Sequence, residues 1–472
     1  MRAEPPRAAR PRAAALLLGG CLALAALSLL APSSPSYDPF AWIVWGRELV
    51  GAGQTFGVAG GPSWKPLPVL FTAPFSLVGD AAPALWLLVA RTGLLLALAG
   101  GYRLGARLGG RGAGLVSAAA LLLLDGLVSL AWRGASEPLL LACVLWAIER
   151  HIAGRRGSAF ALGVAAALIR PEAWPFLALY AAWRWRVGLA PRERWLLLGG
   201  LALIPVLWFG VPAIGGDPLA ASTTASSRAG DGVGAGTALR RGLALGVLPV
   251  WVLAAAALAL RPGDRTLRAL ALGAAAWLAL VVAMTAAGYA GVARYMLPAA
   301  AVACVIAGVG VTTLLAHARA RGAWRVVIAA AILAVCIGPG IERAATLDDQ
   351  VREGVAVAHA HDDLVRAIDA SGGATALRGC ALGGWVAINH TAQSALAWEL
   401  RVPLDRVALT MHHPGVLVGG ARSAATGAPP SLTLPNLRRR TLARAGAWRV
   451  DVISGAGASL SPRCKLMPPG GV

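Results

Sequence analysis

Runs of apolar residues recur along the first three quarters of the chain, separated by short polar segments. They cover about residues 13–31, 81–100, 113–131, 136–149, 157–169, 172–184, 194–213, 242–260, 268–287, 296–316 and 326–341. Because a helix needs roughly 20 apolar residues to cross a bilayer, each run predicts a transmembrane helix, although three of them are short. Short segments interrupted by proline are typical of helices that line cavities. The pattern predicts an all-α polytopic membrane protein with about eleven transmembrane helices.

The last part of the chain, residues 343–472, is more polar. A helical pattern covers about 347–369, strand-like runs lie near Arg406–Thr410 and Gly415–Val418, and proline and glycine interrupt the chain around 427–435. These features predict a small C-terminal α/β domain. The expected organisation is therefore a basic N-terminus at 1–12, a transmembrane domain at 13–342 and the small domain at 343–472. No internal repeat is visible, which argues against a transporter built from inverted halves.

Composition supports the membrane interpretation. The chain is 57% hydrophobic and 14% charged, with a mean hydropathy of +0.66. Soluble domains are about half apolar and a quarter charged, so a lipid bilayer is an expected partner. The net charge of +21 also raises the question of nucleic-acid binding. No arginine-rich helix with interleaved aromatic residues stands apart from an apolar run, so we expect no nucleic-acid partner.

The distribution of arginines predicts the orientation, because cytoplasmic loops are enriched in Lys and Arg. With residues 1–12 in the cytoplasm, the inner segments receive most of the arginines: Arg2, Arg7, Arg10, Arg12, Arg103, Arg107, Arg111, Arg150, Arg155, Arg156, Arg184, Arg186, Arg192, Arg194, Arg261, Arg265, Arg268, Arg319, Arg321 and Arg325. The outer loops receive far fewer. We therefore expect a multi-pass plasma-membrane protein with its C-terminal domain outside the cytoplasm. The first apolar run could instead be a signal peptide, which would leave the next loop on the same outer face.

Two cysteines lie in the polar C-terminal part. If that part is extracytoplasmic, Cys380 and Cys464 could form a disulfide. The other four, at positions 21, 143, 304 and 336, lie in apolar runs and are interpreted as small core residues.

Ionisable residues recur at the predicted outer ends of the helices. The first outer loop is expected at 32–80 and a second long one at 214–241; the charged and phenolic residues on this side include Asp38, Arg47, Glu48, Lys65, Arg133, Glu137, Arg170, Glu172, Asp217, Arg228, Asp231, Arg294 and Tyr295. Ionisable groups near a bilayer are costly and usually mark a site or a water-filled cavity. Together they provide acid, base and anion-binding groups for one outward-facing cavity.

Several of these residues also have plain structural interpretations. Asp38 could be the N-cap of an amphipathic helix over 40–50, on which Arg47 and Glu48 would form a solvated face. Lys65 could be an interfacial lysine rather than a phosphate ligand. Arg170 and Glu172 could pair with each other, and Arg294-Tyr295 could be an interfacial anchor. Deeper in the helices, Arg91 and Asp125 are expected to compensate each other.

An outward-facing cavity with a carboxylate and several cations suits an anionic, lipid-borne substrate. A polyprenyl-phosphate sugar fits this description: its tail would lie between helices, and cations would hold its phosphate. A carboxylate would deprotonate an acceptor hydroxyl that attacks the anomeric carbon from the opposite face.

The chain resembles the GT-C superfamily of polytopic glycosyltransferases over roughly residues 13–341. The resemblance rests on Tyr37-Asp38-Pro39, Ala135-Ser136-Glu137-Pro138, Leu168-Ile169-Arg170-Pro171-Glu172 and Ala293-Arg294-Tyr295-Met296-Leu297-Pro298. Members that resemble it include protein mannosyltransferases and bacterial arabinosyl- and aminoarabinosyltransferases. The resemblance implies an inverting hexosyl- or pentosyltransferase that uses a polyprenyl-phosphate sugar donor and a cell-envelope glycan, lipid or protein acceptor.

By the same resemblance, Asp38 is the catalytic base, and Lys65, Arg170 and Arg294 are candidates for the donor phosphate. We also assign Glu137, Glu172, Tyr295, Glu48 and Arg228 to substrate binding. Some members carry two adjacent acids in the first loop, whereas proline follows Asp38 here. We therefore predict no cofactor and no metal, although a divalent ion is compatible with the chemistry.

Two other functions remain open from the sequence. A flippase or transporter of lipid-linked glycans would need polar groups through the bilayer, and only Arg91 and Asp125 lie near mid-depth. A non-catalytic protein would use the C-terminal domain as an envelope-binding module on a membrane scaffold.

Overall fold

The structure is a computed structural model that describes residues 11–51, 56–58, 60–227, 234–320, 323–383, 385–434 and 437–454. Its α-helices are α1 (Pro11–Ser28), α2 (Tyr37–Val50), α3 (Pro66–Phe75), α4 (Ala82–Leu122), α5 (Leu127–Trp132), α6 (Glu137–Ile152), α7 (Arg156–Ala167), α8 (Trp174–Val187), α9 (Pro191–Pro205), α10 (Val211–Ile214), α11 (Ala220–Ser227), α12 (Ala235–Leu243), α13 (Leu248–Leu260), α14 (Arg265–Ala286), α15 (Leu297–Ala320), α16 (Ala323–Ala370), α17 (Gly373–Leu382) and α18 (Gln393–Glu399). The strands are β1 (Val386–Ile388), β2 (Val407–Ala408), β3 (Thr410–Met411), β4 (Gly415–Gly420), β5 (Ser431–Leu432), β6 (Arg438–Ala445) and β7 (Trp448–Ser454).

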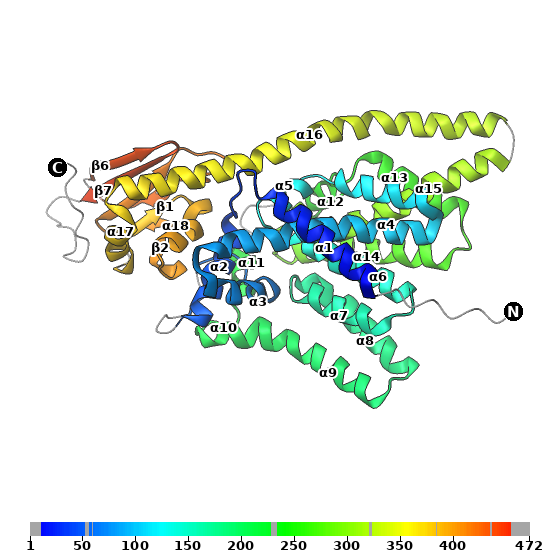
Figure 1. Ribbon diagram of the computed structural model, residues 1–472, viewed down its shortest axis with the longest axis horizontal. Coiled ribbons are helices and arrows are strands. Elements are labelled where there is room, and N and C mark those ends of the chain that lie inside the picture. Colours follow the sequence, from blue (N-terminus) through cyan, green and yellow to red (C-terminus); the bar gives the residue numbers. More distant parts are fainter. Residues whose placement is uncertain are drawn as a thin grey trace.

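The predominantly helical fold with a small C-terminal sheet is confirmed (Figure 1). The expected count of eleven membrane-spanning helices is not confirmed. By length and composition, the described residues contain four helices able to cross a membrane: Pro66–Leu122, Pro191–Ile214, Arg265–Ala286 and Ala293–Ala318. The bent pair α12 and α13, which meet at 84°, would make a fifth. The other apolar runs do form helices, but most of these are too short or too polar at their ends to qualify.

A hairpin within α4 accounts for two of the predicted runs. Gly110 has φ +84° and ψ 174°, a conformation that only glycine adopts readily, and the chain reverses there. The two arms of α4 then pack closely: a Cβ on Gly105 would lie 2.3 Å from Ser117 Oγ, and one on Gly114 would lie 2.6 Å from the Tyr102 carbonyl oxygen. Glycine at these positions lets the arms approach each other.

Helix α2 lies at the centre of the molecule rather than on a surface. Phe40, Trp42 and Trp45 are almost fully buried, and Thr72 Oγ1 of α3 donates to the Trp42 carbonyl oxygen at 2.6 Å. The expectation of an amphipathic helix with a solvated face over 40–50 is therefore wrong. Helices α3 and α4 cover one side of α2, and α18 of the C-terminal domain covers another.

Helix α16 links the two parts of the molecule. Its 48 residues run unbroken from the apolar end at Ala323 to the C-terminal domain, so it crosses the boundary expected at 342/343 (Figure 1). The domain contains a five-stranded sheet of order β2-β1-β4-β7-β6, in which β1 pairs in parallel with β2 and β4 while β7 is antiparallel to β4 and β6. Trp448 Nε1 of β7 donates to the Ala360 carbonyl oxygen of α16 at 2.6 Å. Strands β2, β3 and β4 overlap the predicted strand-like runs, whereas β1, β5, β6 and β7 were not predicted.

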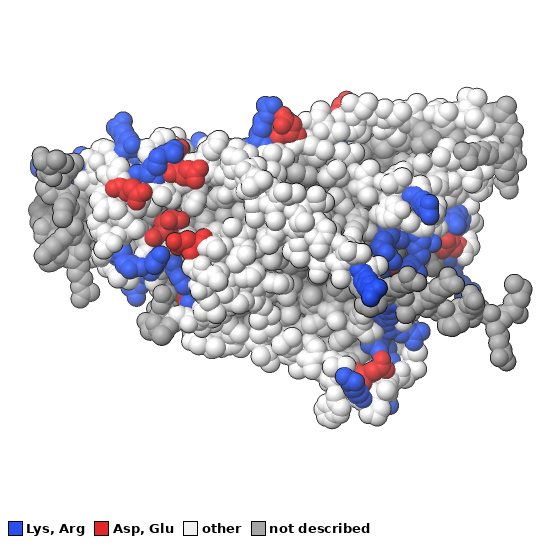
Figure 2. All heavy atoms as spheres, viewed as in Figure 1, with Lys and Arg blue, Asp and Glu red and all other residues white. Residues whose placement is uncertain are grey.

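Charged side chains gather at the two ends of the molecule. Figure 2 shows Lys, Arg, Asp and Glu around the C-terminal domain and around the turns from α6 to α7 and from α8 to α9, with a band between them that carries few charges on this face apart from a group on α16. This band has the surface expected of a protein that crosses a bilayer.

The expected pairing of Arg91 with Asp125 is wrong. Arg91 donates to the carbonyl oxygens of Ser28 and Trp132 and to the hydroxyl of Ser33, and it lies over the Trp132 ring. Asp125 pairs with Arg343 of α16 instead. Both are contacts that hold helices together.

Candidate active site

Asp38 lies in the first turn of α2, where the helix dipole favours a carboxylate. The N-cap is Ser36, not Asp38, and the Ser36 amide donates to the Arg133 carbonyl oxygen at 2.9 Å. The Asp38 side chain is therefore free for another contact. Its Oδ2 accepts a hydrogen bond from Arg294 Nη2 at 3.1 Å. Arg294 is thus the counter-ion of the Asp38 carboxylate.

Glu137, at the start of α6, is the central counter-ion of the site. Its Oε1 lies 3.6 Å from both Lys65 Nζ and Arg294 Nε. Its side chain is only 1% exposed. A buried carboxylate between two cations allows all three to remain charged away from water.

Lys65 precedes α3 and is held from three sides. Its Nζ donates to Ser136 Oγ at 2.8 Å, approaches Glu137 and lies 5.0 Å from the centroid of the Trp42 ring. Burial lowers the pKa of Lys65 to about 8, and the attraction of Glu137 opposes part of that decrease. This ammonium group is fixed and poorly solvated, which strengthens its interaction with an anion.

Arg170 is the N-cap of the short helical turn Pro171–Ala173, and Glu172 lies within that turn. Arg170 Nε lies 3.5 Å from Glu172 Oε2, and its guanidinium lies 3.6 Å from the centroid of the Tyr295 ring. Arg170 is buried, yet its Nε and Nη2 have no hydrogen-bond partner among the described residues. Buried donors of this kind are normally satisfied, so they indicate a ligand or water that completes them.

These cations line one cavity, which we call the cationic chamber, of about 200 Å³. The lining residues are Asp38, Ser63, Trp64, Lys65, Ile169, Arg170, Pro171, Glu172, Trp174, Trp208, Phe209, Ala221, Ser222, Val281, Met284, Thr285, Tyr289, Ala290, Arg294 and Tyr295. One part therefore carries three cations with the carboxylates of Asp38 and Glu172, and most of the remaining lining is aromatic and aliphatic. The apolar part includes Val281 and Met284 of α14, a helix long and apolar enough to span a membrane.

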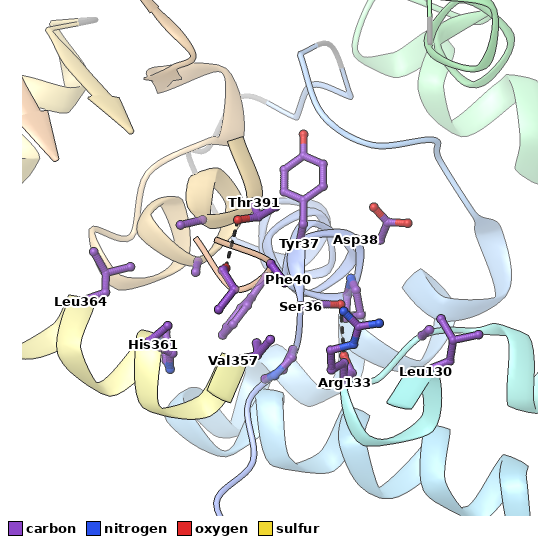
Figure 3. A pocket seen from close by; sticks show the side chains of 18 of the residues that line it. Ser36, Tyr37, Asp38, Phe40, Leu130, Arg133, Val357, His361, Leu364 and Thr391 are labelled. Carbon is purple, nitrogen blue, oxygen red and sulfur yellow. Dashed lines mark hydrogen bonds between the residues drawn. The ribbon is translucent and has the colours of Figure 1, made fainter. Parts of the chain in front are cut away.

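A second cavity, the domain-side chamber, lies against α2 and measures about 180 Å³. Figure 3 shows Asp38 and Arg133 at one side of it, with Val357, His361 and Leu364 of α16 at another. The C-terminal domain contributes Thr391, Ala392, Ala395, Ala424, Ala425 and Trp448 to its wall. Asp38 and Arg294 line both chambers. The carboxylate is thus situated where the two cavities adjoin.

Most of the residues assigned from the sequence lie together. The structure brings Asp38, Lys65, Glu137, Arg170, Glu172, Arg294 and Tyr295 into this one region. Glu48 is not among them: its Oε2 accepts from the Gly57 amide at 3.3 Å, on another face of α2. Glu48 lines neither chamber, so the structure does not bring it together with the other residues assigned to substrate binding. Arg228 lies outside the described residues.

Sequence reasoning missed two groups that position the cations. Ser136 accepts the hydrogen bond of Lys65, and Trp42 provides the ring beneath it. Ser136 directly precedes Glu137 in one of the quoted motifs, so its position was a usable signal. Trp42 was hidden within an apolar helix. Among the described residues, no group of three or more His, Cys, Asp and Glu side chains is placed to hold a metal ion.

Arg47 and Glu48 serve the contact between α2 and the C-terminal domain. Arg47 donates to the carbonyl oxygens of Trp398, Ala397 and Val402 at 3.2, 3.4 and 2.8 Å. Ser394 Oγ adds a bond of 2.6 Å to the Tyr37 carbonyl oxygen. The domain that walls the second chamber is thereby fastened to the helix that carries Asp38.

Comparison with known proteins identifies the fold. No protein-family model matches the chain, and no curated protein sequence is significantly similar. A crystal structure of ArnT from Cupriavidus metallidurans bound to undecaprenyl phosphate matches 95% of this chain and 99% of its own, with 16% sequence identity and a TM-score of 0.54. The crystal structure of ArnT from the same organism in the apo state also matches 95% of this chain and 99% of its own, with 17% sequence identity and a TM-score of 0.52.

An oligosaccharyltransferase from Archaeoglobus fulgidus, tethered to an acceptor peptide, matches 72% of this chain and 55% of its own. The identity is 15% and the TM-score 0.41. The two ArnT structures show that this chain has the fold of ArnT, in agreement with the resemblance of its motifs to GT-C glycosyltransferases.

Proposed function

We propose that this protein is a membrane glycosyltransferase of the GT-C type. It transfers a sugar from a polyprenyl-phosphate donor to a cell-envelope acceptor on the extracytoplasmic face, with inversion and with Asp38 as the general base. The observation that carries this proposal is the position of Asp38 between a cationic chamber and a second cavity. Donor and acceptor can thus approach the carboxylate from different sides.

The cationic chamber has the chemistry that the donor requires. Lys65, Arg170 and Arg294 offer charge-assisted hydrogen bonds to a phosphate. The aromatic residues beside them suit a sugar, and Val281 and Met284 suit the first isoprene units of a lipid tail. ArnT, whose fold this chain shares, binds undecaprenyl phosphate, which supports the assignment of this donor class.

The reaction follows from these positions. The acceptor oxygen forms a bond to the anomeric carbon while the bond from that carbon to the phosphate oxygen breaks. Asp38 takes the proton of the acceptor hydroxyl. The electron pair of the broken bond leaves with the polyprenyl phosphate, whose added negative charge is stabilised by Lys65, Arg170 and Arg294. Attack opposite the leaving group inverts the anomeric centre.

Asp38 is a better base than Glu137, the other carboxylate nearby. The Glu137 side chain is 1% exposed and lines neither chamber, whereas that of Asp38 is 16% exposed and lines both. Glu137 holds Lys65 and Arg294 in place instead. We assign it a positioning role.

The orientation rests on two observations. Arginines of the predicted inner loops lie at the end of the molecule away from Asp38 and the C-terminal domain (Figure 2). In addition, Cys380 of the C-terminal domain is disulfide-bonded; Cys464, its predicted partner, lies outside the described residues. Disulfides are typical of compartments outside the cytoplasm. The N-terminus is accordingly cytoplasmic in this proposal, and the domain is extracytoplasmic.

The test is a transfer assay with purified protein, a panel of polyprenyl-phosphate sugars and membrane extracts as acceptors, read by mass spectrometry. Asp38→Asn should lower the transfer rate about 10²- to 10⁴-fold while expression and thermal unfolding stay unchanged. Asp405→Asn is the matched control, because it makes the same substitution at a carboxylate that is 52% exposed and lines neither chamber. Full activity of Asp38→Asn would remove this residue from the mechanism.

A further inference from the structure

A groove in the C-terminal domain concentrates positive charge away from Asp38. It has a volume of about 370 Å³ and is lined in part by Arg439 and Arg444 of β6 and Arg449 of β7. The carboxylate of Asp451 faces them: Arg449 Nε lies 2.8 Å and Arg439 Nη1 3.9 Å from its Oδ2. Thr441 Oγ1 donates to the other oxygen at 2.9 Å. The carboxylate of Asp363, at the turn between the two strands, accepts from the Ala447 amide at 3.2 Å and is paired with Arg366. Three arginines around one carboxylate leave an excess of two positive charges.

Arg444 has no ion pair or hydrogen bond with any residue that the structure describes. It is exposed, and it stands directly opposite Arg449 in the register of β6 and β7. Like charges directly opposite on one face of a sheet are destabilising. The site therefore carries an electrostatic cost that a bound anion would remove.

A β-bulge produces this arrangement. Thr441 pairs with Asp451, but the register shifts between Thr441 and Ala443, so that Ala443 pairs with Val450 and Arg444 with Arg449. Without the extra residue, alternation would turn Arg444 toward the opposite face. Bulges commonly re-aim a side chain in this way.

The walls of the groove suit an extended, flat ligand. Gly419 places no side chain over the groove, and Pro429 and Pro430 form an apolar side. Trp448 lines this groove and also the domain-side chamber that contains Asp38. A chain lying in the groove could therefore continue toward the carboxylate.

We propose that this groove, formed by Arg439, Arg444 and Arg449, binds the anionic part of the acceptor, a glycan or polyol chain that carries phosphate or carboxylate groups. The forked guanidinium groups recognise either anion. Strands β6 and β7 lie at the end of the molecule remote from the sparsely charged band, which favours a soluble chain over a lipid headgroup (Figures 1 and 2). Naming the ligand as acceptor rests on the proposed function, whereas the binding itself does not.

Binding is measured with the purified full-length protein in detergent, using three chains of matched length: poly(glycerol phosphate), polygalacturonate and uncharged dextran. The first two distinguish phosphate from carboxylate as the recognised group. Arg444→Gln should weaken binding of the preferred anionic chain about tenfold, the effect of losing one charge-assisted contact. Arg440→Gln is the matched control, because Arg440 is exposed on the same strand but pairs with Val452 on the other face.

Tighter binding of an anionic chain than of dextran, weakened by Arg444→Gln and not by Arg440→Gln, supports the proposal. Equal effects of both substitutions, no effect of Arg444→Gln, or no preference over dextran would overturn it. Repeating the measurement with Asp38→Asn separates the two proposals, since that substitution should abolish transfer and leave binding intact. Because Arg444 is exposed and unpaired with described residues, its replacement leaves the sheet contacts of the domain in place.

Discussion

At the scale of single residues, the charge on Lys65 decides how strongly the cationic chamber holds a phosphate. Burial lowers the pKa of Lys65 to about 8, so the side chain is protonated below that pH and neutral above it. We expect kcat/KM for the donor to fall as the pH rises through about 8, mainly through a higher KM. The measurement is a pH profile of transfer between about pH 6 and 10.

Lys65→Arg provides the control for this prediction. Arginine stays protonated throughout this range, so the alkaline limb should move to higher pH even if the overall rate falls. An unchanged limb in the variant would assign the titration to another group. Lys65→Met should instead raise the KM for the donor about 10- to 100-fold below pH 8, and its difference from the wild type should shrink above that pH.

At the scale of elements, the contact between α2 and α18 fixes the wall of the domain-side chamber. Arg47 donates to three carbonyl oxygens at the C-terminal end of α18 and lies over the Trp398 ring, at 5.2 Å from its centroid. Arg47→Met should lower the free energy of unfolding by roughly 2–3 kcal/mol, because these acceptors lose a charged donor. Limited proteolysis and thermal unfolding measure the loss.

Arg352→Met is the matched control for Arg47→Met. Arg352 is 74% exposed on α16 and pairs only with Asp348, one turn away. Such pairs contribute little, so this variant should keep the protease resistance of the wild type. Equal sensitivity of the two variants would contradict the role given to Arg47.

Glu48, on the same helix, should make this contact depend on pH. Burial raises the pKa of Glu48 to about 8, and the hydrogen bond from the Gly57 amide opposes only part of that increase. The folded state thus binds a proton that the unfolded chain releases near pH 4.5. The stability that Glu48 contributes is fully present below pH 4.5 and is lost as the pH rises through about 8.

We therefore expect the unfolding temperature of the wild type to fall by roughly a few °C between pH 5 and 8. Glu48→Gln, which cannot ionise, should remove most of this slope. The same slope in both proteins would show that other groups cause it.

The elements also show what the sequence could predict. The apolar runs predicted the helices, because a lipid bilayer requires long apolar segments. Four short motifs predicted the cluster around Asp38, because the polar groups of each motif lie at the start or the end of an apolar run. The burial of α2 could not be predicted, since it depends on α18, more than 350 residues away in the chain. The strand β6 was missed because its sequence, RRRTLARA, lacks the alternation of a half-buried strand and contains a bulge.

At the scale of the whole molecule, every functional proposal depends on which side of the membrane Asp38 faces. The C-terminal domain and the turns from α6 to α7 and from α8 to α9 lie on opposite sides of the sparsely charged band (Figures 1 and 2). Asp405 of the domain is 52% exposed, and Arg192 at the start of α9 is also exposed. Cysteines placed at these two positions should therefore be labelled from opposite sides.

In intact cells, a membrane-impermeant maleimide should label Asp405→Cys but not Arg192→Cys, which should react only after permeabilisation. The wild-type chain is measured alongside to subtract any labelling of Cys336, which is half-buried; Cys21, Cys143 and Cys304 are buried and Cys380 is disulfide-bonded. The reverse pattern would place the domain and Asp38 in the cytoplasm. A lipid-linked sugar presented on the outer leaflet would then be out of reach of the carboxylate, and the proposed transfer would fail irrespective of the chemistry of the site.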